Sequence, residues 1–294
     1  MYDCKLVIDA RAELGEGPIW DAEQQVLYWV DILGENLHIY DPARKQDQVI
    51  PIGQQISTVV PYFMGRVALT TENGFFSLEL DNGKLTPIAD PERDRPNNRF
   101  NDGKCDAAGR FWAGTMSMDG SGRSGSLYCL DLNGNVKTVL GDIACSNGIA
   151  WSLDNKKMYY IDSGSKQVVA FDYDIELADI SNRSIIVDLS NENVYPDGMT
   201  IDAEGMIWVA LWDGYRVNRW NPATGELLDT ISVPTGKVSA CAFGGPNLDE
   251  LYITTARENM SAEQLENEPI AGGLFCVKTA VKGVPSHALR QKRI

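Results

Sequence analysis

Asp202-Ala203-Glu204-Gly205-Met206-Ile207-Trp208-Val209 is a polar turn followed directly by a short β-rich run, and it is the clearest copy of a unit that recurs along the chain. Runs of this kind recur at intervals of about 40 to 48 residues when one apolar residue of each is aligned. The aligned residues are Trp29, Leu69, Trp112, Tyr160, Trp208 and Tyr252. This interval is typical of one four-stranded propeller blade.

The copies also share their turns. Asp21-Ala22-Glu23 and Asp106-Ala107-Ala108-Gly109 precede two of the runs, and acidic residues such as Asp41 and Asp131 end the following strand. Six such units can close into a ring, which leaves no long unpaired sheet edge. We therefore predict an all-β fold, a six-bladed β-propeller with four-stranded blades, as a single domain over residues 1–294. A pair of two-sheet sandwiches is the alternative, but the regular interval and the lack of a linker argue against it.

The two ends of the chain indicate how the ring closes. The run Cys4-Lys5-Leu6-Val7-Ile8-Asp9 belongs to no repeat, and the last repeat lacks an outer strand after Gly273-Leu274-Phe275-Cys276-Val277. We expect the N-terminal strand to pair into the last blade and close the ring.

The composition and charge of the chain limit the kinds of partner that we expect it to bind. The 294 residues include 26 Lys and Arg against 41 Asp and Glu, a net charge of −15, which disfavours nucleic acid. Apolar runs stay far below the roughly 20 residues that span a bilayer, and we see no secretory signal. Six scattered cysteines read as reduced thiols. We expect a cytoplasmic protein with no nucleic acid, no membrane and no obligate protein partner.

Oxygen-bearing side chains stand at one phase of the repeat, where the chain enters the innermost strand of a blade. They are Glu16, Asn101, Asn147 and Asp197, and three of the four are followed by glycine. Carboxylate and amide oxygens that converge on the channel suit a hard cation such as Ca²⁺, Mg²⁺ or Mn²⁺, and Zn²⁺ can occupy such sites. A single Asx-Gly pair can also be an ordinary turn, but four oxygen-bearing residues at the same phase of the repeat favour a metal site.

Other side chains define what the site could do. Arg99 and Asn101 lie two residues apart on an extended segment and so point to the same side. Arg99 could bind substrate hydroxyls or a carboxylate, or pair with Asp94 or Asp102. The chain has only two histidines, His38 and His287, which argues against a Ser-His-Asp relay.

Several stretches resemble the family of gluconolactonases, regucalcin (senescence marker protein) and luciferin-regenerating enzyme, in the same order over nearly the whole chain. They include Gly15-Glu16-Gly17-Pro18, Asn98-Arg99-Phe100-Asn101-Asp102-Gly103-Lys104, Ala113-Gly114-Thr115-Met116, Ser146-Asn147-Gly148, Pro196-Asp197-Gly198-Met199 and Ala242-Phe243-Gly244-Gly245.

The resemblance implies a six-bladed propeller with one divalent metal ion on Glu16, Asn147 and Asp197. It implies that Arg99 and Asn101 contact the substrate. Asp119 stands where the regucalcin branch has a substrate-binding glutamate, on a shorter loop and with a side chain one methylene shorter. Ca²⁺ is the first candidate for the ion, before Zn²⁺, Mn²⁺ and Mg²⁺.

These observations predict a divalent-metal-dependent lactonase that hydrolyses a small-molecule sugar lactone, with Asp197 as general base. Two alternatives remain open at this point. One is hydrolysis of a phosphotriester or another ester at the same metal, and the other is a calcium-binding propeller without catalysis.

Overall fold

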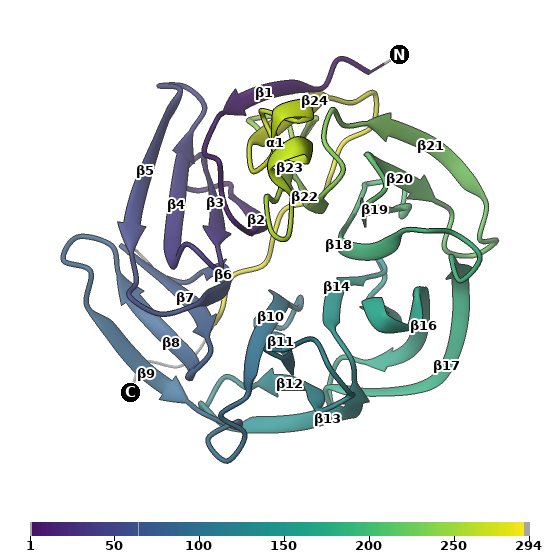
Figure 1. The fold of residues 1–294 in the computed structure, drawn as a ribbon. Helices are drawn as coiled ribbons and strands as arrows, with labels where there is room; N and C mark the ends of the chain where they lie inside the picture. Colours follow the sequence, from purple (N-terminus) through teal and green to yellow (C-terminus); the bar gives the residue numbers. More distant parts are fainter. Residues whose placement is uncertain (1, 64, 291–294) are drawn as a thin grey trace.

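The computed structural model describes residues 2–63 and 65–290. Six antiparallel four-stranded sheets stand around a central axis, as Figure 1 shows, and this confirms the predicted six-bladed propeller. Each blade runs from an inner strand at the axis to an outer strand at the rim.

In blades one to five the strands follow one another in chain order, and blade six takes its outer strand from the N-terminal part of the chain. Blade one holds β2 (Gly15–Asp21), β3 (Val26–Asp31), β4 (Asn36–Asp41) and β5 (Gln46–Pro51); blade two β6 (Ile56–Pro61), β7 (Arg66–Thr71), β8 (Gly74–Glu79) and β9 (Leu85–Ala89); blade three β10 (Asn98–Cys105), β11 (Phe111–Ser117), β12 (Gly125–Leu130) and β13 (Val136–Ile143); blade four β14 (Ser146–Trp151), β15 (Lys157–Asp162), β16 (Gln167–Asp174) and β17 (Asp179–Asp188); blade five β18 (Tyr195–Ile201), β19 (Ile207–Trp212), β20 (Arg216–Trp220) and β21 (Leu227–Ser232); blade six β22 (Val238–Gly244), β23 (Glu250–Thr255), β24 (Leu274–Lys278) and β1 (Lys5–Ile8).

The N-terminal strand closes the ring, as expected. Strand β1 is the outer strand of blade six and pairs antiparallel with β24, with Lys5 opposite Cys276 and Leu6 opposite Phe275. The first and last parts of the chain therefore share one sheet.

The recurring turn before the second strand has a structural reason. The Asp202 carboxylate accepts hydrogen bonds from the Met206 backbone N–H and from the Trp208 indole, each at 2.9 Å. In blade three the Asp106 carboxylate accepts in the same way from the Arg110 backbone N–H and from the Trp112 indole, at 2.9 and 2.8 Å. A buried aspartate thus satisfies both the turn and the buried indole, which explains why this residue pattern repeats.

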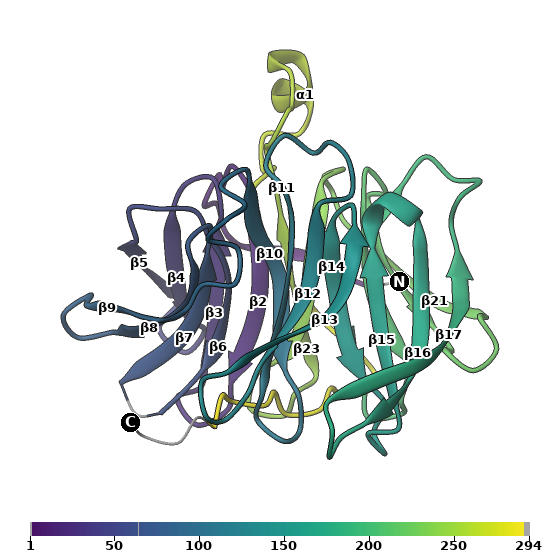
Figure 2. The ribbon, with the colours of Figure 1, turned by 90° about the horizontal axis from the view of Figure 1, so that it is seen from below.

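The two faces of the ring differ, as the side view in Figure 2 shows. The short helix α1 (Ala262–Asn267), which begins at a capping box on Ser261, projects from one face. Across the other face runs the C-terminal segment 279–290, hereafter the C-terminal strap. Its backbone N–H groups donate to three distant parts of the chain: Gly283 to the Leu248 carbonyl at 2.7 Å, Leu289 to the Pro61 carbonyl at the end of β6 at 2.9 Å, and Arg290 to the Gly109 carbonyl at 3.0 Å. Over the described ranges, no helix has the length and apolar character needed to cross a bilayer.

Candidate metal and substrate site

All six inner strands lose their regular pairing shortly after they begin. In the four strands that carry the candidate residues, the shift falls between Glu16 and Ile19, Phe100 and Gly103, Asn147 and Ile149, and Pro196 and Met199. Such bulges bend a strand and redirect a side chain, and they are common beside active sites.

Glycine is needed at two of these bulges because the backbones of neighbouring blades approach closely. A Cβ atom on Gly148 would lie 2.6 Å from the Asp197 carbonyl oxygen, and one on Gly198 would lie 2.3 Å from the Ala240 Cβ. The sequence pattern of an acid or amide followed by glycine therefore reports a bulge packed against the next blade.

The remaining two inner strands carry serine at the same phase. The Ser57 hydroxyl donates to the Phe100 carbonyl and the Ser239 hydroxyl donates to the Gly15 carbonyl. These two positions join neighbouring blades, whereas the other four supply carboxylates and amides.

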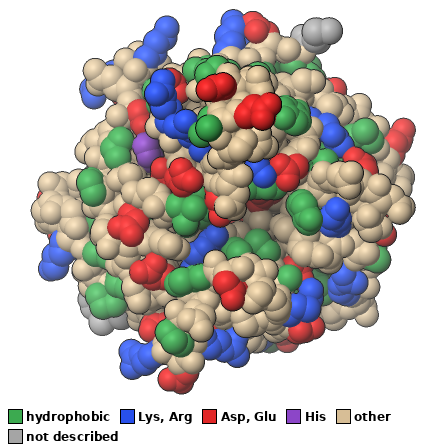
Figure 3. Space-filling view, viewed as in Figure 1, with side chains coloured by type: hydrophobic (Ala, Val, Ile, Leu, Met, Phe, Trp, Pro, Cys, Tyr) green, Lys and Arg blue, Asp and Glu red, His purple; other side chains and the backbone are tan. Residues whose placement is uncertain are grey.

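One cavity of about 640 Å³ collects the candidate residues at the mouth of the channel on the α1 face. Figure 3 looks onto this face, which is hollowed near its centre. The structure brings together all of the residues that the sequence singled out for the site: Glu16, Arg99, Asn101, Asp119, Asn147 and Asp197.

Two oxygen atoms in the cavity wall are buried and have no hydrogen-bond partner. They are Asn147 Oδ1 and Asp197 Oδ1. The Asn147 amide nitrogen donates to Ser163 Oγ at 3.0 Å, and that hydroxyl in turn donates to the Pro196 carbonyl at 2.6 Å. Ser163 therefore fixes the amide so that its oxygen stays free. Buried acceptors without a donor indicate a group that completes the site.

The two carboxyl groups are costly to hold ionised side by side. Burial, together with the negative charge of Asp102, raises the pKa of Glu16 to about 8. Burial, together with the negative charge of Glu16, raises the pKa of Asp197 well above its ordinary value. A bound divalent cation would relieve both effects because it stabilises the ionised forms.

Glu16, Asn147 and Asp197 fit a hard cation. Within residues 2–63 and 65–290 no three His, Cys, Asp or Glu side chains form a metal-binding group. The candidate ligands are therefore two carboxylates and one amide oxygen, a set that suits an oxygen-preferring ion with further positions left for water or substrate.

Asn101 has a different role from Asn147. Its Oδ1 accepts from Arg99 Nη1 at 2.6 Å, and its Nδ2 donates to the Ser146 carbonyl at 2.9 Å. Both ends of this amide are thus engaged, which separates it from the candidate ligands.

Arg99 makes no ion pair with Asp94 or Asp102. Its Nη1 donates to the Phe100 carbonyl at 2.9 Å and to Asn101, and its side chain lines the cavity. Burial lowers the pKa of the guanidinium. A buried guanidinium without an acidic partner within ion-pair distance is suited to bind a polar ligand.

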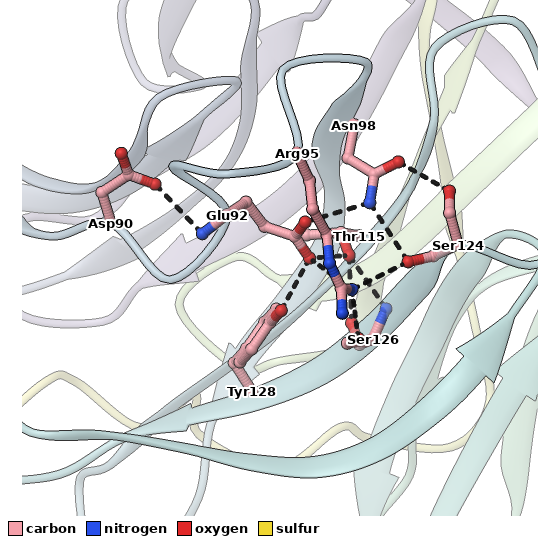
Figure 4. Close-up of polar contacts among 8 residues, drawn as sticks. All are labelled: Asp90, Glu92, Arg95, Asn98, Thr115, Ser124, Ser126 and Tyr128. Atoms are coloured by element: carbon pink, nitrogen blue, oxygen red, sulfur yellow. Dashed lines mark hydrogen bonds and ion pairs between the residues drawn. The ribbon is translucent and has the colours of Figure 1, made fainter.

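Asp119 lies on the loop between β11 and β12, which Figure 4 shows to be fastened at its base. Buried Glu92 accepts from Thr115 Oγ1 at 2.8 Å, Tyr128 OH at 2.7 Å and Asn98 Nδ2 at 3.0 Å. Asn98 Nδ2 also donates to the Ser124 carbonyl at 3.1 Å, where the loop ends.

The Asp119 carboxylate is bound to its own loop. It accepts from Ser117 Oγ at 2.6 Å and from the Ser121 backbone N–H at 2.8 Å, and these bonds lower its pKa to about 2. Asp119 therefore presents a permanent negative charge at the edge of the cavity.

Further residues that the repeat pattern did not single out also line the cavity, among them Ser163, Trp212 and Glu258. Ser163 and Glu258 follow the second strands of their blades, β15 and β23, and Trp212 is the last residue of the second strand β19. Asp119 follows β11 in the same way, so a scan of the repeat at this second phase would have found them.

The fold and the site together define a six-bladed propeller with an acidic, oxygen-rich cavity at one mouth of its channel. Residues 14–257 match the family described as the SMP-30/gluconolactonase/LRE-like region. The chain belongs to this family.

Named relatives cover almost the whole chain. It is 41% identical over 281 residues to the Bacillus subtilis (strain 168) protein YvrE, provisionally named a sugar lactone lactonase, with 96% of each chain covered. It is 41% identical over 283 residues to regucalcin of Gallus gallus, covering 94% of this chain and 95% of that protein. The structure also superposes on that of a luciferin-regenerating enzyme with a TM-score of 0.93 and 36% identity, covering 99% of this chain and 100% of the other.

Proposed function

We propose that this protein is a metal-dependent lactonase that opens sugar lactones of the aldonolactone type. In this proposal Glu16, Asn147 and Asp197 hold one divalent cation, with Ca²⁺ as the first candidate. Arg99, which Asn101 positions, binds the substrate. Membership of a family that includes gluconolactonases supports the reaction class.

One observation carries the proposal. The unpartnered oxygens Asn147 Oδ1 and Asp197 Oδ1 lie in the wall of a cavity that Glu16 and Arg99 also line. Such a cavity offers a cation site and a hydroxyl-binding guanidinium within reach of a single small ligand.

Each residue then has a defined task. A divalent cation would polarise the lactone carbonyl and withdraw charge from its oxygen as water adds. Asp197 accepts a proton from the attacking water. Arg99, held by Asn101, donates hydrogen bonds to hydroxyls of the sugar ring and fixes its orientation.

The test is a hydrolysis screen of aldonolactones against paraoxon-type phosphotriesters, with and without a chelator. We expect turnover of lactones only, its complete loss in EDTA, and recovery when Ca²⁺, Mn²⁺, Zn²⁺ or Mg²⁺ is returned. Full activity in a rigorously metal-free preparation would refute the metal role. Turnover of phosphotriesters in preference to lactones would favour the ester-hydrolase alternative.

A calcium-binding propeller without catalysis remains the second candidate. A structure of a regucalcin from Agrobacterium tumefaciens, described as a calcium-binding protein, superposes with a TM-score of 0.95 and 27% identity over 98% of each chain. Calorimetric binding of Ca²⁺ without turnover of any lactone in the screen would support this reading.

A further inference from the structure

Glu258 is an acidic residue of the cavity that the proposed mechanism does not use. It follows β23 on the segment that leads to α1, and it lines the same cavity as Glu16 and Arg99. Its side chain is half-buried.

The backbone holds Glu258 in place. The N–H groups of Arg257 and Glu258 both donate to the Glu13 carbonyl, at 3.0 and 2.9 Å, and Ala256 pairs with Leu14 in an isolated bridge. Glu13 and Leu14 directly precede β2, which carries Glu16. Glu258 is therefore fixed to the segment that enters the metal-site strand.

The Glu258 carboxylate has no partner among the described residues. No side chain there donates a hydrogen bond to it or lies within ion-pair distance, although an arginine lines the same cavity. The negative charge of Glu258 acts on the Arg99 guanidinium, as do those of Glu16 and Asp197. A free acceptor and a held donor that line one cavity match the paired hydroxyls of a sugar.

The charge of the cavity limits what can enter. Among the described residues that line the cavity there are four carboxyl groups, those of Glu16, Asp119, Asp197 and Glu258, and one guanidinium, that of Arg99. With a divalent cation bound, one negative charge remains in excess. Glu258 and Asp119 lie outside the candidate ligand set, so their charge acts on the substrate.

We propose that Glu258 makes the site select uncharged, polyhydroxylated lactones and reject lactones that carry a carboxylate. The inference rests on the proposed lactonase function and assigns a specificity role to a residue that the proposed mechanism does not use. The Glu258 carboxylate accepts a hydrogen bond from a ring hydroxyl of the neutral substrate, whereas it repels an anionic substituent at that place.

The same charge acts on the product. Hydrolysis breaks the bond between the lactone carbonyl carbon and the ring oxygen, forms a bond from that carbon to the water oxygen, and leaves the ring oxygen as a hydroxyl. The new acid ionises, so a neutral substrate becomes an anion inside a negatively charged cavity. Glu258 therefore also weakens binding of the product.

The experiment uses two lactones that differ in one group. D-glucono-1,4-lactone has a hydroxymethyl group at C6, and D-glucaro-1,4-lactone has a carboxylate there. For the metal-loaded protein we expect kcat/KM to favour the neutral lactone by at least tenfold, with a smaller preference at high salt because salt screens the repulsion. In Glu258→Gln the ratio should fall at least tenfold, and inhibition by gluconate should strengthen.

The control is Glu263→Gln, an equal change of charge at an exposed position of α1. It should leave the ratio and its salt dependence unchanged. Calorimetry should show that Glu258→Gln still binds the metal and is saturated with it under the assay conditions, which separates substrate selection from damage to the site.

Two outcomes are distinct. A parent protein that hydrolyses no lactone overturns the proposed function. A parent that hydrolyses lactones, with a neutral-to-anionic ratio that Glu258→Gln leaves unchanged, overturns only the role of Glu258.

Discussion

The two mouths of the channel are built from opposite ends of the same inner strands, and they have opposite character. At the α1 face, Glu16 lies at the start of β2, one residue after Gly15, and β18 holds Asp197. The cavity of about 640 Å³ on this face is rich in charge. At the other face, the same strands supply Ile19 and Ile201 to a cavity of about 300 Å³. The C-terminal strap crosses this second mouth, where Val284 joins the apolar wall.

Along these inner strands, the residues that could bind a ligand lie at one end, and residues that stabilise the fold lie at the other. At the mouth on the α1 face, hereafter the site mouth, the bulges leave acceptors without donors and place two carboxyl groups together, which lowers the stability of the fold. At the opposite mouth, which the C-terminal strap crosses and which is hereafter the strap mouth, Leu289 is 3% exposed. It packs in the core cluster shared by the first three blades. Substitutions at the two mouths should therefore act on different measurable properties.

The largest effect is expected at the site mouth from Asp197→Asn. The change keeps an oxygen but removes the proposed base and one ligand charge, so kcat should fall by roughly 10²–10⁴. Metal affinity should also fall, as measured by calorimetry. The exposed Asp81→Asn is the matched control and should match the parent in both. An unchanged kcat would remove Asp197 from the mechanism.

The corresponding change at the strap mouth is Leu289→Ala. Loss of this buried side chain should lower the free energy of unfolding by about 2–5 kcal/mol, while kcat/KM at a temperature where the protein stays folded should not change. Denaturant unfolding and a lactone assay measure the two quantities. Leu177→Ala, at a side chain that is 66% exposed, should be neutral in both. Loss of activity in folded Leu289→Ala would show that the two mouths are coupled.

The pH dependence of stability should depend on the carboxyl groups of the site mouth and not on the residues of the strap mouth. Because the pKa of Glu16 is about 8 in the fold against 4.5 as its ordinary value, the unfolded chain loses this proton first as the pH rises. The stability of the metal-free protein should therefore fall between about pH 4.5 and pH 8, by an amount on the order of a few kcal/mol. Saturating metal should abolish most of this slope, because a bound cation stabilises the ionised carboxylate. A flat metal-free profile would argue against a buried Glu16 that keeps its proton in the fold.

The smallest effect is expected from Arg99→Ala, a change within the site mouth. Arg99→Ala leaves the candidate metal ligands in place, so metal affinity should change little. The value of kcat/KM for a hydroxylated lactone should fall by roughly 10- to 100-fold, since a hydrogen bond from a charged group is lost. A lactone without ring hydroxyls should lose much less. Equal losses for both substrates would assign Arg99 a structural role.

Much of the fold could be predicted because it repeats. A buried aspartate that serves both a turn and an indole occurs in blades three and five, as Asp106 with Trp112 and as Asp202 with Trp208. These two pairs are part of the spaced pattern of turns and apolar runs that reveals the unit. The strand left over at residues 4–9 then predicted how the ring closes. The in-phase residues Glu16, Asn147 and Asp197 could be found for the same reason, since each occupies an equivalent point of its blade.

What the sequence alone determined is therefore the set of elements and the residues that stand in phase with them. The tertiary structure decided which of these residues share a cavity and what each is free to do. Asn101 and Asn147 are equivalent in the repeat, yet Arg99 occupies the oxygen of one and Ser163 leaves the oxygen of the other free. The roles of Glu258 and of the C-terminal strap likewise depend on contacts that only the folded chain makes. Contacts between side chains far apart in the chain follow from how the blades pack, and no local pattern encodes them.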